Sequence, residues 1–272
     1  MIVSVIYVVL YLKKKMFLKK IENTPFDPAL RVYLKKIVHY KNLSDHDKRK
    51  IEKSIQIFSS TKEFIGVDIM ITDEIKTVIA FYACLLLLKL EDLGCYEDLK
   101  TIIVYPSPVV INKIKENNGI FQKEDFVIDG QSSSGTVIIV WNDAKSEAYH
   151  LTKNNLIIHE FAHEIDFMDG EIDGVPPMQR SKYLEWTSLL YKEFSKLQEK
   201  LLRDEDFGKY KILGAYAGTN EAEFFAVLSE RFFESPKLLK KDFPQLYEKM
   251  YDFYKIDTLS LSEKKDSDEK SF

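Results

Sequence analysis

The sequence predicts an α+β fold in which helices dominate and a small mixed sheet packs on one central helix. Most of the 272 residues lie in segments with apolar residues at helical spacing. Two shorter segments, around Ile102 and Val137, are rich in β-branched residues, which favour strands. The central helix is expected within NNLIIHEFAHEIDFMDG, residues 154–170, where apolar residues surround two histidines.

The composition is that of a globular protein. Hydrophobic residues make up 45% of the chain and charged residues 30%. The net charge of −4 leaves no basic excess to neutralise phosphates, so we expect no nucleic-acid partner. The two cysteines, Cys84 and Cys95, are too few for a disulfide framework or a cysteine metal site. Cys84 lies in an apolar run, which is typical of a buried reduced thiol.

Residues 1–20 form an apolar N-terminal segment that ends in basic residues. MIVSVIYVVLYLKKK is shorter than the roughly 20 apolar residues that span a bilayer. It also lacks the leading charge and the cleavage site of a secretory signal. We expect residues 1–12 to dock on the protein or to make weak membrane contact, in preference to forming a true anchor. If the segment inserts in a membrane, the lysines at 13–15 favour a cytoplasmic body.

Additional helices are expected on the N-terminal side. In LSDHDKRKIEKSIQIF, residues 43–58, Ser44 is a plausible N-cap before apolar residues at helical spacing. In TDEIKTVIAFYACLLLLKL, residues 72–90, Thr72 has the same position. The nearly continuous apolar body of this second segment predicts a buried helix.

Two strands are expected before the central helix. KTIIVYPSPVVI, residues 100–111, should form a strand that ends in a turn at Pro106 and Pro108. GQSSSGTVIIVW, residues 130–141, begins as a flexible turn and continues as a second strand ending near Trp141.

Helices are expected again after the central helix and a loop rich in Gly, Pro and Asp. A long amphipathic helix should begin at Ser181. Another helix in TNEAEFFAVLSERFFESP should open at Thr219 or Asn220 and close before Pro236. We therefore expect a single domain over residues 21–258. The polar residues 259–272 predict a disordered tail.

HEFAH, residues 159–163, has the spacing of a zinc hydrolase motif. Positions i and i+4 share a helix face, about 5–6 Å apart, so His159 and His163 can direct their imidazoles at one metal ion. Glu160 lies roughly 100° round the helix, where it can take a proton from a water molecule that attacks a carbonyl. The alternative is a helix with two unrelated histidines, but imidazoles without partners are unfavourable in such apolar surroundings. The motif predicts a zincin-like metallopeptidase core.

Catalytic zinc usually has three protein ligands, so one more must come from elsewhere. No His-x-x-Gly-x-x-His extension follows His163, which argues against a metzincin pattern. His39 and His46 lie in charged surroundings typical of solvated side chains, and His150 is a weak reserve candidate.

A carboxylate from the helix that begins near Thr219 is the favoured third ligand. Glu223 and Glu230 share a face of this helix, whereas Glu221 points about 200° away from Glu223. Glu223 enters the apolar part of the helix, where a carboxylate needs a cation or hydrogen-bond donors. We therefore rank Glu223 first, Glu230 second and Glu221 third.

Asp166 is a candidate to accept a hydrogen bond from the N–H of a metal-bound imidazole. It lies one turn after His163 and two turns after His159. Metal-bound histidines almost always donate their second ring nitrogen to such a group. A solvated carboxylate at the helix end is the alternative.

Several segments, taken in order, resemble the Mlc titration factor A family of zinc peptidases. The resemblance is carried by ACLLLL, IIVYPSPVVI, LIIHEFAHEID, GVPP and AYAGTNEAEFFAVLSERFFESP, and it extends from about Leu43 to Tyr254. It implies a gluzincin-type metallopeptidase with aminopeptidase-like activity, with a core related to the catalytic domain of anthrax lethal factor. One member of the family also binds the transcriptional repressor for which the family is named.

The resemblance also implies the roles of individual residues. It makes His159, His163 and Glu223 the ligands of one Zn²⁺ ion and Glu160 the general base. It assigns Tyr216, in AYAGTNEAE, as a hydroxyl donor to the oxyanion. Without the resemblance, Tyr216 would be one of 15 tyrosines in ordinary packing.

The leading hypothesis is therefore a zinc-dependent peptidase acting on peptide or protein substrates. An exopeptidase needs an acidic partner for the free α-amino group, and Glu221 and Asp166 are both candidates. The alternative is a protein that sequesters a transcriptional regulator, with the zinc site secondary. The intact Glu160 counts against a vestigial site, because a structural site needs no base. A zinc amidase acting on a non-peptide bond is a third hypothesis.

Two segments depart from the family pattern. The turn reads GQSSSG where an aromatic residue is expected after Gln-Ser, and residues 143–150 are unusually polar. We expect both at the substrate-facing rim.

Overall fold

The structure is a computed structural model that describes residues 12–13, 15–21, 23–90, 93–117, 120–128 and 135–263. Its helices are α2 (Arg31–Leu34), α3 (Val38–Asn42), α4 (Asp45–Thr61), α5 (Asp73–Leu86), α6 (Trp141–Ala148), α7 (Leu156–Asp166), α8 (Arg180–Leu202), α9 (Glu221–Glu234), α10 (Pro236–Asp242), α11 (Pro244–Tyr254) and α12 (Thr258–Ser262). Its strands are β1 (Glu63–Gly66), β2 (Thr101–Tyr105), β3 (Val109–Asn117), β4 (Ile120–Ile128) and β5 (Thr136–Val140). A helix-dominated α+β fold is thereby confirmed.

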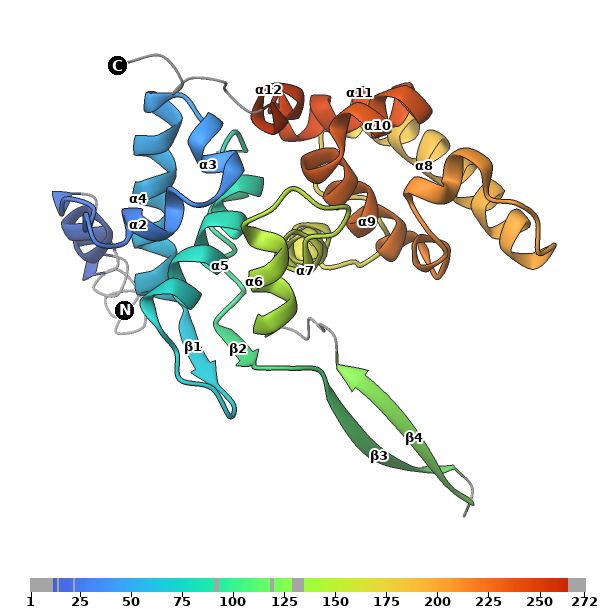
Figure 1. Ribbon diagram of the computed structural model, residues 1–272, viewed down its shortest axis with the longest axis horizontal. Coiled ribbons are helices and arrows are strands. Elements are labelled where there is room, and N and C mark those ends of the chain that lie inside the picture. The colour runs from blue at the N-terminus through green and yellow to red at the C-terminus, as the bar shows by residue number, and fades with distance from the viewer. Residues whose placement is uncertain are drawn as a thin grey trace, which may run out of the picture.

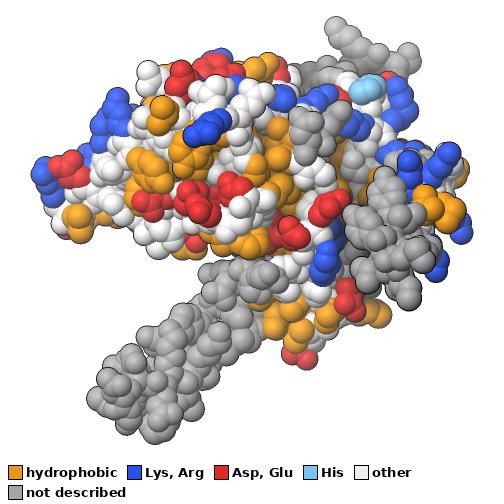
Figure 2. All heavy atoms as spheres, turned by 180° about the vertical axis from the view of Figure 1, so that it is seen from behind, with side chains coloured by type: hydrophobic (Ala, Val, Ile, Leu, Met, Phe, Trp, Pro, Cys, Tyr) orange, Lys and Arg blue, Asp and Glu red, His pale blue; other side chains and the backbone are white. Residues whose placement is uncertain are grey.

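The helices form two groups with α6 and α7 between them (Figure 1). Helices α2 to α5 gather on the N-terminal side, and α8 to α12 gather on the other side. The hairpin β3–β4 extends away from this body (Figure 1). On the opposite face, hydrophobic side chains reach the surface between acidic and basic ones (Figure 2).

Two predicted caps begin the N-terminal helices. Ser44 accepts the backbone N–H of Asp47 at 3.1 Å at the start of α4. Thr72 accepts that of Ile75 at 3.3 Å at the start of α5, which is buried along most of its length. Helix α8 begins at Arg180, one residue before the predicted start at Ser181, and has no side-chain cap.

The central sheet is parallel rather than mixed over the described residues. Its order is β1-β2-β5, with Glu63 opposite Thr101 and Thr101 opposite Thr136. Helix α5 makes the crossover between β1 and β2 that a parallel pair requires. β1 was not predicted, because its four residues are too few to show a strand pattern.

The hairpin β3–β4 was also not predicted. Its strands pair in antiparallel register, with Val109 opposite Ile128. The strand predicted to end at Pro106 and Pro108 does so, because β2 ends at Tyr105 and residues 106–108 separate it from β3. The sequence signal that predicts this hairpin is the Asn-Gly pair at 118–119.

The polar segment at residues 143–150 belongs largely to helix α6. Lys145 pairs with Glu74 of α5, with 2.9 Å between nitrogen and oxygen. Glu147 accepts the backbone N–H of Leu156 at 2.7 Å. The polar side chains of this segment therefore support the two helices next to it.

Helix α7 is central to the hydrophobic core. It contacts α5, α9 and β5. Ile157, Ile158 and Phe161 are completely buried along it. Because each such side chain stabilises the fold by about 1.5–3 kcal/mol, the helix is held firmly from three sides.

Residues 259–262, which were expected to belong to a disordered tail, are helical. They belong to helix α12, and Leu261 is buried because it packs on the core. Residues 264–272, residues 1–11 of the apolar segment and residues 130–134 of GQSSSG lie outside the described residues. Among the residues that are described, no helix has both the length and the apolar character needed to cross a membrane.

Candidate metal centre

Helix α7 begins at a cap that orients its first turn. The side chain of Asn155 accepts the backbone N–H of Ile158 at 3.1 Å. The helix then places His159 and His163 on one face, because four residues make little more than one turn. The apolar residues of the same helix face the core and leave both imidazoles on its other side.

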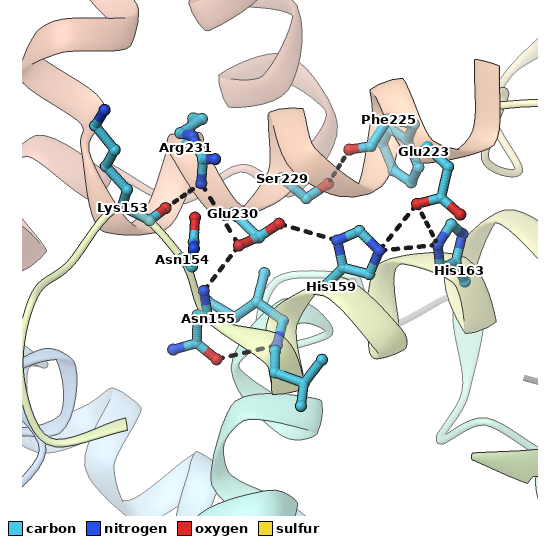
Figure 3. A network of polar contacts seen from close by, with 12 residues as sticks. Lys153, Asn154, Asn155, His159, His163, Glu223, Phe225, Ser229, Glu230 and Arg231 are labelled. Carbon is cyan, nitrogen blue, oxygen red and sulfur yellow. Dashed lines mark hydrogen bonds and ion pairs between the residues drawn. The ribbon is translucent and has the colours of Figure 1, made fainter. Parts of the chain in front are cut away.

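The two imidazoles converge on a carboxylate from α9 (Figure 3). The Nε2 atoms of His159 and His163 are 3.2 Å apart. Glu223 Oε2 lies 3.0 Å from His159 Nε2 and 3.4 Å from His163 Nε2. One ligand atom from each of these three residues lies within 4.8 Å of the others. The structure thus brings together the three residues that were predicted as ligands.

The start of α9 positions Glu223. Asn220, one of the two predicted caps, accepts the backbone N–H of Glu223 at 2.9 Å. Glu223 therefore lies in the first turn of the helix, with its carboxylate directed at the face of α7. Of the three glutamates ranked from sequence, Glu223 is the one whose carboxylate meets both imidazoles.

Glu230 has a role that the sequence analysis missed. Its Oε1 accepts the Nδ1–H of His159 at 2.9 Å, and its Oε2 accepts the backbone N–H of Asn155 at 2.8 Å (Figure 3). Helices α7 and α9 run antiparallel here, since Asn155 meets Glu230 and His163 meets Glu223. The sequence signal for this role is that Glu223 and Glu230 share a helix face. The sequence analysis used that signal only to rank the two residues as metal ligands.

A buried network continues beyond Glu230. Arg231 donates to the carbonyls of Ile212 at 2.6 Å and of Lys153, and its Nη1 lies 3.5 Å from Glu230 Oε2. One turn further on, Glu234 accepts the side-chain N–H of Asn155 at 2.8 Å. These contacts fix α9 against the segment that enters α7.

The charges of the centre form ion pairs. Burial disfavours the His159 imidazolium, but hydrogen bonds to Glu223 and Glu230 raise the pKa of His159 to about 10. Burial also disfavours the Glu223 carboxylate, but the hydrogen bonds from His159 and His163 hold its pKa well below the usual range. A positive charge is therefore favoured among these groups.

The donor atoms fit a metal ion. When neutral His159 donates its Nδ1–H to Glu230, its Nε2 lone pair faces the Glu223 oxygen and the Nε2 atom of His163. Lone pairs this close repel one another unless a proton or a cation lies among them. Two imidazole nitrogens and one glutamate oxygen are the protein ligands of the His₂Glu class of catalytic zinc sites.

Glu160 and Tyr216 flank the convergent groups. Glu160 follows His159 on α7 and is only 3% exposed. Tyr216 begins the short 3₁₀ helix η4 (Tyr216–Gly218) and is 58% exposed. Its ring centroid lies 5.8 Å from that of His159, so it lies beside the centre.

Asp166 holds a loop rather than the predicted imidazole N–H. Its Oδ2 accepts the backbone N–H of Gly174 at 2.8 Å, and its Oδ1 is buried with no hydrogen-bond partner among the described residues. Burial raises the pKa of Asp166 to about 7. The imidazole of His159 is held by Glu230 instead, because the antiparallel α9 passes beside it.

The remaining histidines lie elsewhere. His39 was expected to be solvated but is 1% exposed, with its Nε2 at 3.1 Å from the carbonyl of Phe233. The apolar helices packed around α3 bury it, and burial lowers its pKa to about 4. His46 is exposed as predicted. His150, the reserve ligand, is exposed, and its Nδ1 lies 3.3 Å from the carbonyl of Ser146.

A sequence family matches most of the chain. Residues 12–255 match the family described as glucose-regulated metallo-peptidase M90. This range contains every residue of the centre.

Individual relatives cover nearly the same range. An uncharacterized protein of Synechocystis is 34% identical over 251 residues, which cover 89% of this chain and 88% of the relative. Mlc titration factor A of Pectobacterium atrosepticum is 32% identical over 223 residues, 80% of this chain and 82% of the relative. Mlc titration factor A of Cronobacter sakazakii is 31% identical over 239 residues, 86% of this chain and 87% of the relative.

Proposed function

The chain belongs to the M90 family of metallopeptidases, together with the Mlc titration factor A proteins, and from this premise we propose that it is a zinc-dependent peptidase of the gluzincin type. Residues 21–258 would form its single zincin-like domain. The observation that carries the proposal is the convergence of His159, His163 and Glu223, whose ligand atoms lie within 4.8 Å of one another. These three residues would hold one zinc ion per chain.

The protein's own groups have complementary tasks in this proposal. When bound, zinc would polarise the peptide carbonyl and increase the acidity of a water molecule. The Glu160 carboxylate takes the proton of the attacking water and passes it to the leaving amine. The Tyr216 hydroxyl donates a hydrogen bond to the oxyanion, and its exposed position at the centre supports this role. Glu230 keeps the His159 ring in place.

Aminopeptidase-like specificity requires a negative charge for the substrate's α-amino group. Of the two candidates, Asp166 is completely buried and engaged with Gly174. Glu221 is half-buried at the first position of α9, two residues before Glu223. Of these two, Glu221 remains the candidate for the α-amino group, and its side chain leaves α9 about 200° round the helix from that of Glu223.

A peptide-library digest tests this function. We expect the wild-type chain to release N-terminal residues. Glu160→Gln should keep its zinc and lose about 10²–10⁴-fold in rate, because no base then accepts the proton. Glu223→Ala should lose the zinc as well. Glu221→Gln should keep cleavage while losing the preference for free N-termini.

Several results would contradict the proposal. Full hydrolysis by Glu160→Gln would exclude Glu160 as the base, and unchanged zinc content in Glu223→Ala would exclude Glu223 as a ligand. Internal cleavage with no dependence on a free amine would exclude the exopeptidase assignment while leaving the peptidase intact.

A second function is suggested by the name of the relatives. Mlc titration factor A links those proteins to the regulator Mlc. We propose that this chain also binds a transcriptional regulator in the cytoplasm, on a surface separate from the metal centre. Binding should then persist in Glu160→Gln, which can be measured with the purified regulator. Loss of regulator binding in Glu160→Gln would contradict a separate surface and would place both functions at the metal centre.

A further inference from the structure

The basic end of the apolar N-terminal segment, residues 12–21, is exposed to solvent. We call these residues the basic segment. The first 21 residues of the chain contain five lysines and no acidic residue, although the whole chain has a net charge of −4. Residues 15–21 are helical. The lysines that the structure describes within the basic segment are all exposed, and none is paired with a described carboxylate: Lys13, Lys15, Lys19 and Lys20. Their charges are therefore available to a partner.

Large apolar side chains are exposed between these lysines. Leu12 is 48% exposed, Met16 63% and Phe17 46%. Met16 and Lys20 lie on one face, because they are four residues apart in a helix. Basic and hydrophobic side chains lie side by side at this end of the molecule, at the right of Figure 2. Exposed apolar groups that gather in this way mark an interaction surface.

The basic segment is held at one end of the molecule. Thr24 follows it, and the Thr24 hydroxyl donates to the carbonyl of Lys20 at 2.9 Å. The carbonyl of Thr24 accepts hydrogen bonds from two residues of α4, Lys53 at 2.9 Å and Gln56 at 3.2 Å. The segment thus extends from a fixed point on α4, at the N-terminal side of the body and apart from α7 and α9 (Figure 1).

The mixture of lysines and apolar side chains favours a lipid surface over a nucleic acid. Both carry the negative charge that complements the lysines. Leu12, Met16 and Phe17 gain free energy by leaving water for the acyl region of a bilayer, whereas a phosphate backbone offers them nothing comparable. Clusters of about 4–8 basic residues on an amphipathic helix are typical of segments that bind anionic membranes.

We propose that the basic segment binds the surface of an anionic lipid bilayer. Its helix lies in the plane of the head groups, with the apolar side chains directed into the acyl boundary and the lysines among the phosphates. Each lysine at such a surface strengthens binding about fivefold. The chain is thereby held at the membrane without crossing it, and the binding does not depend on the proposed peptidase reaction.

The test is sedimentation of the full chain with lipid vesicles. One set consists of phosphatidylcholine alone, and the other contains about one third anionic phosphatidylglycerol. We expect at least about tenfold stronger binding to the anionic vesicles. Binding should fall as salt is raised from about 0.1 M to about 1 M, because the screening length shortens from about 10 Å to about 3 Å. Glu160→Gln should bind as the wild-type chain does.

Two sets of lysine variants separate this surface from a general charge effect. Replacement of the four described lysines of the basic segment by glutamine should abolish measurable binding, since about fivefold is lost at each. The matched control makes the same charge change at four exposed lysines on or next to α8, α10 and α11, and it should keep binding: Lys182, Lys192, Lys241 and Lys255.

Phe17→Ala tests the apolar part of the surface. It should weaken binding by about tenfold with every lysine intact, because less apolar area enters the bilayer. Unchanged binding of this variant would indicate charge attraction alone, as for any polyanion, and would overturn the proposal. The proposal is also overturned if the control lysine variant loses binding equally, if the chain binds phosphatidylcholine vesicles as well as anionic ones, or if it sediments with neither.

Discussion

Glu230 shows how one carboxylate can control a metal ligand. Its two oxygens are shared between the Nδ1–H of His159 and the backbone N–H of Asn155. The side chain therefore determines the tautomer and the orientation of the imidazole as well as the start of α7. Metal-bound histidines in proteins depend strongly on such partners.

We expect Glu230→Gln to weaken zinc binding by about 10–100-fold. The amide has no negative charge opposite His159. It also places an N–H group near the ring N–H of His159 and the backbone N–H of Asn155, which now donate to Glu230. Affinity is measured by competition with a chromophoric chelator. Glu234→Gln is the matched control, since Glu234 bonds to Asn155 but not to His159. Equal affinities of wild type and Glu230→Gln would show that this carboxylate has no effect on the ligand.

At the scale of elements, the loop between α7 and α8 constrains the start of α9. Gly174 has φ of +78°, and a Cβ atom there would lie 2.5 Å from the carbonyl oxygen of Glu221. The N–H of Gly174 is also held by Asp166. The GVPP segment can therefore approach α9 only because residue 174 has no side chain.

We expect Gly174→Ala to destabilise the fold more than Gly170→Ala. Both glycines have positive φ, so alanine is strained by roughly 1–2 kcal/mol at either position. A Cβ at Gly170 meets nothing within 4 Å, so the difference between the variants measures the clash with α9. Chemical denaturation gives both free energies of unfolding. Equal losses would mean that the loop moves aside without cost.

How well each part of the centre could be predicted depends on how far apart in the sequence its contacting residues lie. His159 and His163 share a face because of helix geometry alone, and the caps of α4 and α5 are equally local. The partner of His159 depends on α9 running antiparallel to α7, which no local pattern encodes. The burial of His39 was missed for the same reason, since helices distant in sequence enclose it.

The fold as a whole was predictable in class but not in topology. The segments around Ile102 and Val137 do form strands, yet their parallel pairing depends on the crossover through α5. The short strand β1 gives no pattern of its own, and the polar residues of α6 have their partners on other helices.

At the scale of the whole molecule, Glu234 links folding to pH. Burial raises the pKa of Glu234 to about 8 in the folded chain, although Asn155 donates a hydrogen bond to it. The folded state then keeps a proton that the unfolded chain releases above about pH 4.5. The stabilisation from this proton is complete below that pH and is lost as the pH rises to about 8.

We expect the free energy of unfolding to fall with rising pH over this window, with Glu234 contributing up to about 1.4 kcal/mol per pH unit. Glu234→Gln, which resembles the protonated acid, should remove that part of the slope. His39 and other groups titrate in both chains, so the difference between the two denaturation series isolates Glu234. Parallel series would place the pKa of Glu234 near its ordinary value.

The antiparallel pairing of α7 and α9 has a consequence for the amount of folded protein in a cell. The proposed ligands come from segments some 60 residues apart in the sequence, so a metal ion bound there would act as a removable cross-link between them. Ligands that bind only the folded state stabilise it by about 4 kcal/mol at a thousand times their dissociation constant. Zinc supply would then set how long the chain survives proteolysis, independently of any substrate.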